Sequence, residues 1–282
     1  MHRRKFVLTC LAAPLAAARK ASAAHPIGHR QASMTRKPGP EVFDLARRIP
    51  GITGVELQVH FQKTTLWDRD TLEAYRRGAA KTGMQIPSLA GIWAEGASLV
   101  KPGPAEEAIR KSIAAAEALK ARVILAAAFN ANCPRMDQEA SYGPVVEMLQ
   151  KVAGAAAGAG VTLGLETSLS PADDKKLIDL VARPAVKVYY DADNVERFGH
   201  KGQGAAGHEI IGKSRIAQIH VKNEDRLLEE PGRVEWTAAL QAIRRIGYQG
   251  WLVFESSHSG PEQCIESTAK NIAFIRRQLA SA

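Results

Sequence analysis

Cysteine is scarce in this sequence, and its spacing excludes several kinds of protein. The 282 residues contain three cysteines, Cys10, Cys133 and Cys264. They form no Cys-x-x-Cys pair and no zinc-ribbon spacing. Because Cys10 lies in an N-terminal leader, the mature chain can form at most one disulfide. The hydrophobic content of 45% is enough for one large core, as a single barrel or as two domains.

The chain also lacks a strong net charge outside its first 24 residues, and it has few aromatic residues. The formal charge of the whole chain is +9. Residues 1–24 contain five basic residues and no acidic residue, so the rest of the chain has 33 basic and 29 acidic residues, a net charge of +4. So small and dispersed a charge argues against a nucleic-acid partner. Aromatic residues make up 6% of the chain. Alanine and glycine are plentiful, as is typical of many small packed strand–helix units.

Residues 1–24 have the pattern of a secretory signal. The basic segment Arg3–Lys5 precedes an apolar run, Phe6–Ala18, and a small-residue site at Ala21–Ala23. The start of this segment resembles a twin-arginine export signal, and the apolar run is too short for a membrane span. We expect residues 1–24 to be removed, leaving a domain at 25–282 that is periplasmic or secreted in a bacterium, with no membrane partner. An uncleaved basic tail is the alternative.

Beyond the leader, short apolar segments alternate with segments of helical periodicity. The predicted strands are Pro26–Met34, Ile52–Val59, Gln85–Gly91, Val123–Ala128, Val161–Glu166, Val186–Asp191, Ile216–His220 and Gly250–Ser256. The predicted helices are Val42–Ile49, Asp70–Thr82, Pro104–Lys120, Tyr142–Ala159, Asp173–Val181, Val234–Ile246 and Pro261–Leu279, and the connection after the sixth strand is glycine-rich and irregular. Without a long linker or a shift in composition, this alternation predicts an α/β fold, a single (β/α)₈ TIM barrel.

Four consecutive predicted strands each end in a residue that can bind a metal ion. These residues are Glu166, Asp191, His220 and Glu255. Because the carboxyl ends of barrel strands meet at one rim, the four side chains should converge there. A single acidic residue at a strand end more often caps a loop or forms an ion pair. Three carboxylates and one imidazole in consecutive strands instead favour a hard divalent cation.

Several motifs resemble a known superfamily. They are Gly54-Val-Glu-Leu57, Gly164-Leu-Glu166, the Asp-x-x-Asn pattern of Asp191–Asn194, Ile219-His-Val-Lys-Asn223 and the closing segment Gly247–Glu255. On these motifs the mature chain resembles the xylose isomerase-like TIM barrels, which include sugar phosphate isomerases and epimerases, ketose 3-epimerases and inosose dehydratases.

The resemblance implies a metal centre and two catalytic residues. One divalent ion would be bound by Glu166, Asp191, His220 and Glu255. Mn²⁺ is the expected ion, and Mg²⁺, Co²⁺ or Zn²⁺ are the alternatives. In the ketose epimerases the first and last of these glutamates also move the proton, which implies catalytic roles for Glu166 and Glu255. The implied partner is a small carbohydrate, and a homo-oligomer is left open.

The chain departs from the ketose epimerases at the substrate-binding positions. The ketose epimerases have a histidine at the position of Asn194, whereas inosose-type members have an asparagine. Asn194 is expected either to bind substrate or to cap a helix. The second glutamate of the ketose epimerases is replaced by the segment Ser170–Ala172. Arg226 stands where they place a substrate-binding arginine. Lys222 fits other members of the superfamily and either holds a substrate oxygen or pairs with Glu255.

Four further residues are candidates for substrate binding. By alternation, His29, Glu56 and His60 are expected to face the barrel interior, where they would contact substrate or support the metal ligands. Trp93 follows the third predicted strand and would form a wall against a sugar ring or pack in the core.

These residues predict an enzyme that moves a proton next to a carbonyl group. The expected function is a divalent-metal-dependent isomerase or epimerase that acts on a free ketose, keto-sugar or polyol-derived ketone through a metal-stabilised enediolate. The main alternative is a lyase of the same superfamily, inosose dehydratase-like or keto-glycoside-cleaving. The carboxylate-rich site disfavours a non-catalytic sugar-binding barrel, and the low charge and missing histidines disfavour an endonuclease IV-like nuclease.

Overall fold

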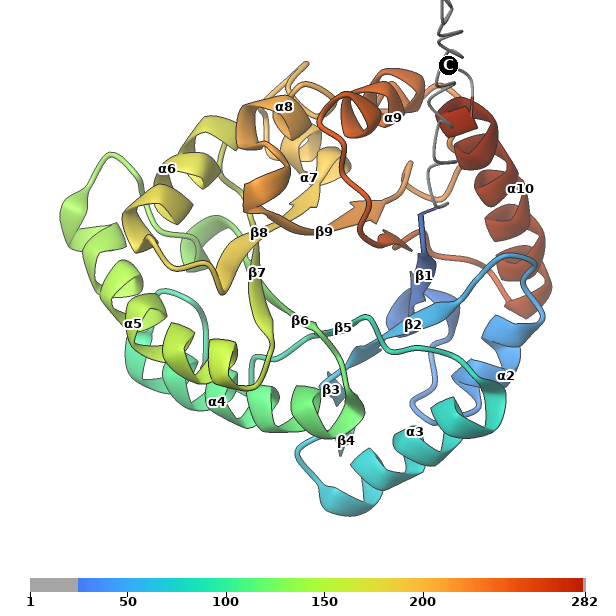
Figure 1. Cartoon of the computed structure of the whole chain (residues 1–282), viewed down its shortest axis with the longest axis horizontal. Coiled ribbons are helices and arrows are strands. Elements are labelled where there is room, and N and C mark those ends of the chain that lie inside the picture. Colours follow the sequence, from blue (N-terminus) through green and yellow to red (C-terminus); the bar gives the residue numbers. More distant parts are fainter. Residues whose placement is uncertain (1–24, 281–282) are drawn as a thin grey trace, which may run out of the picture.

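Eight parallel strands form the centre of the molecule in the computed structural model, which describes residues 25–280. Within these residues the strands close into a barrel in the order β1-β10-β9-β8-β7-β6-β5-β2. The helices surround this barrel on its outer side (Figure 1). The predicted single (β/α)₈ barrel is therefore confirmed. The predicted export signal at residues 1–24 lies outside the described residues.

The element boundaries follow the predicted alternation closely. The barrel strands are β1 (Ile27–Arg30), β2 (Gly54–Gln58), β5 (Ser88–Ala90), β6 (Val123–Ala128), β7 (Thr162–Thr167), β8 (Val186–Asp191), β9 (Ile216–Val221) and β10 (Leu252–Phe254). The helices are α1 (Gln31–Met34), α2 (Val42–Arg47), α3 (Arg69–Thr82), α4 (Pro102–Leu119), α5 (Glu139–Gly158), α6 (Pro171–Val181), α7 (Ala192–Arg197), α8 (Gly207–Ile211), α9 (Trp236–Arg245) and α10 (Pro261–Ala280).

The structure differs from the predicted elements at three places. The first predicted strand, Pro26–Met34, ends at Arg30 and turns into α1, because the buried side chain of Gln31 bonds to Tyr75 Oη at 2.6 Å and to the backbone N of Gln58 at 3.2 Å. A small antiparallel hairpin, β3 (His60–Phe61) and β4 (Thr64–Thr65), follows β2. The irregular connection after β8 contains the short helices α7 and α8.

Local sequence determines where several helices begin and end. Asp68 accepts a hydrogen bond from the backbone N of Thr71 and caps α3, which ends at Gly83 with φ of 70°. Ser170 caps α6 in the same way, and Pro171 takes the first helical position, where its missing N–H costs nothing. Asp68 and Ser170 thus fix where α3 and α6 begin.

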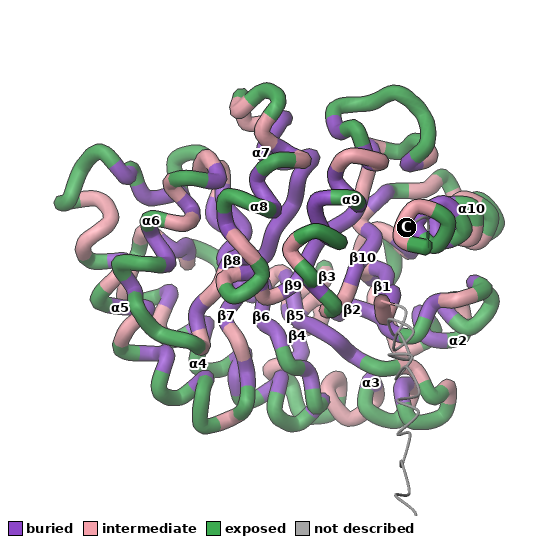
Figure 2. Tube along the Cα trace, turned by 45° about the horizontal axis from the view of Figure 1, so that its top comes forward, coloured by how far each residue is buried: buried purple, intermediate pink, exposed green. Residues whose placement is uncertain are grey.

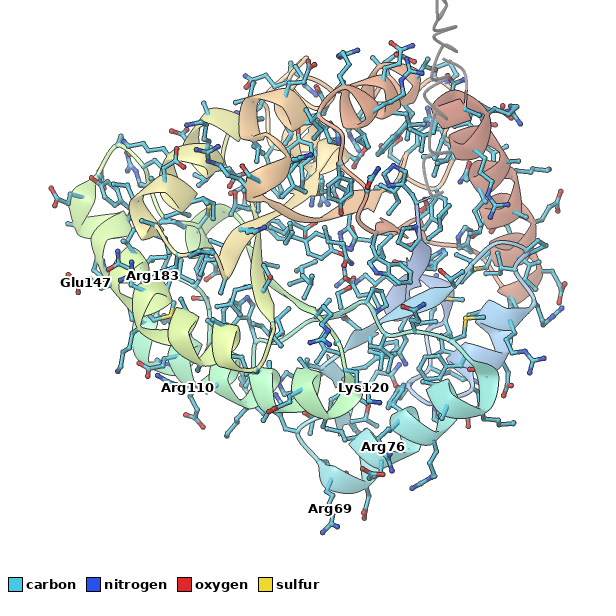
Figure 3. All side chains as sticks on the ribbon, viewed as in Figure 1. Arg69, Arg76, Arg110, Lys120, Glu147 and Arg183 are labelled. Carbon is cyan, nitrogen blue, oxygen red and sulfur yellow. The ribbon has the colours of Figure 1, made fainter. Side chains whose placement is uncertain are left out.

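The core has two parts on the two faces of the barrel strands. The larger part packs the outer faces of the strands against the helices, and Figure 2 shows the strands buried while the outer surfaces of the helices are exposed. A smaller cluster of Ala90, Val123, Leu125 and Tyr189 comes from the alternate strand positions and fills the barrel interior. Charged side chains cover the outside of the ring, for example Arg110 and Glu147 (Figure 3). Among the described residues, no helix is long and apolar enough to cross a membrane.

Gly207 offers a test of the packing around α8. We expect Gly207→Ala to lower the free energy of unfolding by about 1–3 kcal/mol through overpacking. A Cβ there would overlap Tyr190 Oη and lie 2.7 Å from Pro171 Cγ. Tyr190 is 1% exposed and donates to Gly204 O at 2.6 Å, so it has little room to move. Urea denaturation measures the change.

Gly154 is the matched control for this substitution. It is exposed within α5, and a Cβ there meets nothing within 4 Å among the described residues. Gly154→Ala should therefore raise the free energy of unfolding by roughly 0.5–1 kcal/mol. Equal effects of the two substitutions would contradict the packing described around α8.

Candidate metal centre

Four side chains with metal-binding atoms converge at the carboxyl ends of β7, β8, β9 and β10. Glu166 lies on β7, Asp191 ends β8, His220 lies on β9, and Glu255 directly follows β10. Their ligand atoms all lie within 4.8 Å of one another. The first three are buried and Glu255 is half-buried. The four residues selected from the strand endings thus form one cluster.

The imidazole of His220 lies at the centre of this cluster. Its Nδ1 is 3.1 Å from Glu166 Oε1, 3.4 Å from Glu255 Oε2 and 3.8 Å from Asp191 Oδ2. Its Nε2 is 3.0 Å from Glu56 Oε1 on the opposite side of the ring. Burial opposes a charge on His220, but attraction to Glu56 and Glu166 outweighs it and raises the pKa of His220 to about 9.

A buried hydrogen-bond network below the cluster fixes Glu56. Its Oε2 accepts from Ser88 Oγ at 2.7 Å and from Tyr189 Oη at 2.6 Å. Gln218 Nε2 donates to both of these hydroxyl groups at 2.7 Å. Burial alone would raise the pKa of Glu56, but His220 lowers it to about 2. Glu56 therefore stays ionised and holds His220 with Nδ1 toward the three carboxylates, the way an outer carboxylate orients a metal-binding histidine.

Lys222 and Asn194 lie against the carboxylates of the cluster. Lys222 Nζ is 2.6 Å from both Asp191 Oδ2 and Glu255 Oε2, and it donates to Asn194 Oδ1 at 3.2 Å. Burial would lower the pKa of Lys222, but attraction to Asp191 and Glu166 raises it. Asn194 donates from Nδ2 to Glu166 Oε1 at 3.0 Å, and its backbone N is capped by Asp191 Oδ1. Lys222 thus pairs with Glu255, which was one of its two predicted alternatives, and Asn194 lies both at a helix start and inside the site.

Arg30 is a site residue that the sequence analysis missed. Its guanidinium forms an ion pair with Glu255, donates to Gln58 Oε1 at 3.2 Å, and lies 3.8 Å from Glu56 Oε1. Strand alternation puts Arg30 and His29 on opposite faces of β1, and the register that pairs Arg30 with Glu56 across β1 and β2 shows that Arg30 is on the inward face.

The prediction that His29 faces the barrel interior is consequently wrong. His29 points to the outer side of β1, where it contacts His258 and Cys264 of the α10 segment. Because successive side chains of a strand point to opposite faces, an inward Arg30 requires an outward His29.

Three other candidate residues lie apart from the carboxylate cluster. His60 is on the β3–β4 hairpin, with its ring 4.3 Å from that of Trp67. Trp93 is half-buried and donates from Nε1 to Ala127 O at 2.6 Å. Arg226 is exposed and bonds to Pro231 O at 2.9 Å. The described contacts give none of the three a direct partner among the four converging residues.

The chemistry of the converging residues fits a divalent cation. Asp191 Oδ2 is buried, and the Lys222 ammonium lies 2.6 Å from it. A buried carboxylate needs a positive charge beside it, and here Lys222 supplies that charge where a metal ion would otherwise bind. Carboxylate oxygens with one imidazole are suitable ligands for manganese, magnesium, cobalt or zinc.

Comparisons with known proteins agree with this fold. A family model described as xylose isomerase-like TIM barrel matches residues 43–278. No curated protein sequence matches the chain significantly. The structure is similar to 3-keto-D-glucoside 4-epimerase from E. coli, with a TM-score of 0.73 and 16% identity over 90% of this chain and 99% of that one.

Two further solved structures have the same architecture. A D-psicose 3-epimerase has a TM-score of 0.74 and 17% identity, covering 91% of this chain and 100% of that one. A D-allulose 3-epimerase from Methylomonas sp. has a TM-score of 0.73 and 18% identity, with coverage of 91% and 100%. Identities this low establish the shared fold alone.

Proposed function

Because the chain belongs to the xylose isomerase-like TIM barrel family, we propose that it is a divalent-metal-dependent isomerase or epimerase that acts on a small, unphosphorylated keto-sugar. The observation that carries the proposal is the convergence of Glu166, Asp191, His220 and Glu255 at the rim of the barrel. The similar solved structures include proteins named as sugar epimerases, which supports a carbohydrate substrate. The predicted export signal supports a substrate without phosphate, because sugar phosphates are cytoplasmic.

A bound divalent ion would supply a positive charge that stabilises the negative charge developing on the substrate oxygens. Glu166 and Glu255 are the proposed acid–base residues, since both place a carboxylate oxygen beside His220 Nδ1. One carboxylate removes the proton from the carbon next to the carbonyl group. Return by the other carboxylate on the opposite face gives an epimer, whereas return to the neighbouring carbon gives an isomer.

Arg30, Lys222 and Asn194 would position these two glutamates and the substrate. Arg30 pairs with Glu255, and Asn194 donates to Glu166, so each proposed acid–base residue is held by a hydrogen-bond donor. Lys222 has its charged end among the ligand carboxylates and would donate to a substrate oxygen when a cation takes its place beside Asp191. These contacts hold both carboxylates in place before proton transfer.

A lyase of the same superfamily is the second candidate. The specific observation in its favour is Asn194, which stands in the Asp-x-x-Asn pattern of inosose-type members and contacts Glu166. Elimination begins with the same proton removal and differs only in the loss of a leaving group from the next carbon.

Product analysis separates these reactions. Purified protein loaded with Mn²⁺ would be incubated with a panel of free ketoses, 3-keto-glycosides and inososes, and the products followed by proton NMR. An epimer or an isomer supports the proposal. A dehydrated product selects the lyase, and the absence of any product from metal-loaded protein would contradict both.

Lys222 gives a separate prediction on metal affinity. We expect Lys222→Met to strengthen Mn²⁺ binding by about tenfold or more, because the ammonium competes with a cation for Asp191 and Glu255 at 2.6 Å. The same substitution should weaken turnover, since a donor to the substrate is lost. Isothermal titration calorimetry measures the affinity. Lys187→Met, a half-exposed lysine on β8, is the control and should leave it unchanged, and a weaker affinity in Lys222→Met would contradict the competition.

A further inference from the structure

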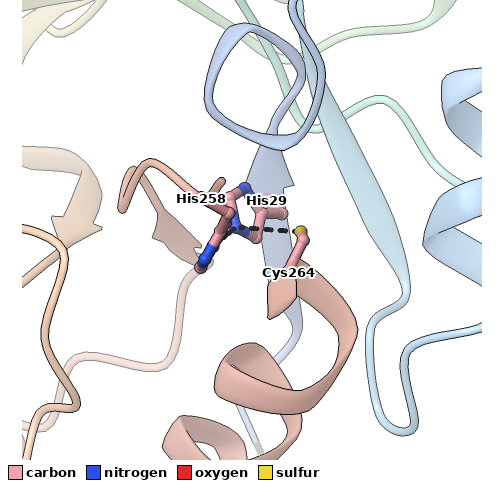
Figure 4. Close-up of side chains that lie close together, drawn as sticks. All are labelled: His29, His258 and Cys264. Atoms are coloured by element: carbon pink, nitrogen blue, oxygen red, sulfur yellow. Dashed lines mark hydrogen bonds between the residues drawn. The ribbon is translucent and has the colours of Figure 1, made fainter. Parts of the chain in front are cut away.

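A second cluster of metal-binding side chains lies on the outer side of β1 (Figure 4). It consists of His29 from β1, His258 from the loop after β10, and Cys264 from the first turns of α10, with ligand atoms within 4.8 Å of one another. None of the three belongs to the rim cluster. The two sites lie on opposite faces of β1. Arg30 points inward and pairs with Glu255 of the rim cluster, whereas His29 points outward and contacts His258, which follows Glu255 on the same loop.

The distances within this cluster match those of tetrahedral zinc. His29 Nε2 is 3.3 Å from His258 Nε2 and 4.0 Å from Cys264 Sγ. Two nitrogens bound to one tetrahedral zinc ion lie about 3.3 Å apart, and a bound nitrogen and sulfur lie about 3.6 Å apart. The nitrogen pair already has the required separation, and the sulfur lies a few tenths of an ångström farther from His29 Nε2 than in a zinc site.

His29 is held in the tautomer that binds metals. Its Nδ1 lies 3.2 Å from Arg30 O, and because a carbonyl oxygen only accepts, Nδ1 carries the hydrogen and Nε2 keeps a lone pair. A backbone carbonyl on the far nitrogen is a common partner of metal-binding histidines. Burial, together with repulsion from His258, lowers the pKa of His29 to about 3, so the ring is neutral at physiological pH. This Nε2 is the atom that lies within 4.0 Å of both other members of the cluster.

His258 and Cys264 complete a set of borderline-soft donors. His258 Nδ1 is buried without a hydrogen-bond partner among the described residues, so the ring is free to choose the tautomer with a lone pair on Nε2. Cys264 is fully buried, and burial raises the pKa of its thiol to about 11. A zinc ion would displace the thiol proton to solvent and bind the thiolate. Two imidazoles and a thiolate favour zinc over magnesium or calcium.

Access and local charge also suit a cation here. His258 lines a surface pocket between the α1 segment and the β10–α10 loop, which gives an ion a route from solvent. The carboxylate of Asp225 accepts from the backbone N of Ser257 at 3.2 Å and attracts a positive charge on His258. Its negative charge would offset the net charge of a zinc–thiolate centre.

We propose that His29, His258 and Cys264 bind a zinc ion that is distinct from the ion at the rim. The ion ties the β10–α10 loop to β1 and to α10. Because Glu255 lies on this loop, zinc at the outer site holds the position of a rim ligand.

Cobalt substitution tests the proposal, because a thiolate ligand gives Co²⁺ a charge-transfer band in the near ultraviolet that oxygen and nitrogen ligands do not give. All proteins carry Cys10→Ser, which removes the cysteine outside the described residues. After gel filtration, about two cobalt ions per chain and this band are expected. Cys264→Ala should lose the band and one ion, whereas His220→Asn should keep the band.

Two further variants make the test independent of folding defects. His258→Gln changes a half-buried loop residue and should also lose the band and one ion. Cys133→Ala, the matched control at the other described cysteine, should change neither. A single ion without the band in the parent protein would overturn the proposal and leave an ordinary hydrogen bond from His258 to His29. A band lost only in Cys133→Ala would overturn it as well.

Discussion

Glu166→Gln is expected to lower the turnover of a keto-sugar substrate by about 10²–10⁴-fold, the range that a positioned acid–base group contributes. Glutamine keeps the shape and the oxygen that accepts from Asn194 at 3.0 Å, but it cannot remove a proton. The Glu166 carboxylate is 3% exposed, and although burial raises its pKa, attraction to His220 lowers it below its ordinary value. It is therefore ionised and available as a base at neutral pH.

The loss of turnover must be separated from a loss of metal. Steady-state kinetics at saturating Mn²⁺, with bound metal measured on the same sample, make this separation. Asp193→Asn is the matched control, because Asp193 is a buried carboxylate beside Asp191 that pairs with Arg233 at 3.2 Å instead of joining the cluster. If Glu166→Gln binds metal fully and retains turnover near that of the parent, Glu166 is not the base.

Removal of divalent ions is expected to abolish turnover and to lower thermal stability. An ion that binds only the folded state stabilises it by about 2.7 kcal/mol at a concentration of 100 times Kd. For a domain of this size that corresponds to a shift in Tm of roughly 5–10 °C. Chelation followed by gel filtration, then calorimetry with and without added Mn²⁺, measures the shift. In His220→Asn the shift should largely disappear, and an equal shift in that variant would place the ion elsewhere.

The affinity for the ion should also depend on pH. His220 binds a metal only when it is neutral, whereas attraction to Glu56 and Glu166, opposed by burial, raises its pKa to about 9. A proton and a cation therefore compete for the same side chain, and Mn²⁺ affinity should rise with pH between about 6 and 9. Titration calorimetry at several pH values checks the slope. An affinity that stays constant over this range would show that His220 is not a ligand.

The barrel and the cluster of candidate metal ligands were predictable because both depend on regular patterns. Strand-by-strand alternation gave eight βα units, and the closing residue of four strands lies where parallel topology puts it, at one rim. The resemblance to xylose isomerase-like barrels, based on motifs such as Gly164-Leu-Glu166, is confirmed by the family model.

The errors arise where a contact distant in sequence overrides a local pattern. Gln31 belongs to α1 because it bonds to Tyr75 and Gln58, and this contact ends β1 at Arg30. The choice of the inward face of β1 depends on its register with β2, which a single strand does not encode. His29 was therefore assigned to the interior in place of Arg30.

The network beneath the site was missed for a similar reason. Tyr189, Ser88 and Gln218 come from three strands, and each one alone is an ordinary residue in an apolar segment. Only the closed barrel brings them to Glu56. The cluster of His29, His258 and Cys264 likewise joins two distant parts of the chain, so its spacing in sequence carries no recognisable motif.

Exchange with heavy water tests the central claim most directly. Metal-loaded protein would be incubated in heavy water with a keto-sugar that it converts or binds. NMR would measure the deuterium at the carbon next to the carbonyl group. We expect deuterium to enter at that carbon with the parent protein, and to be lost on chelation and in Glu166→Gln or Glu255→Gln. Exchange that continues at the parent rate in both variants, or conversion of substrate without any exchange from fully loaded protein, would contradict proton transfer by these two glutamates.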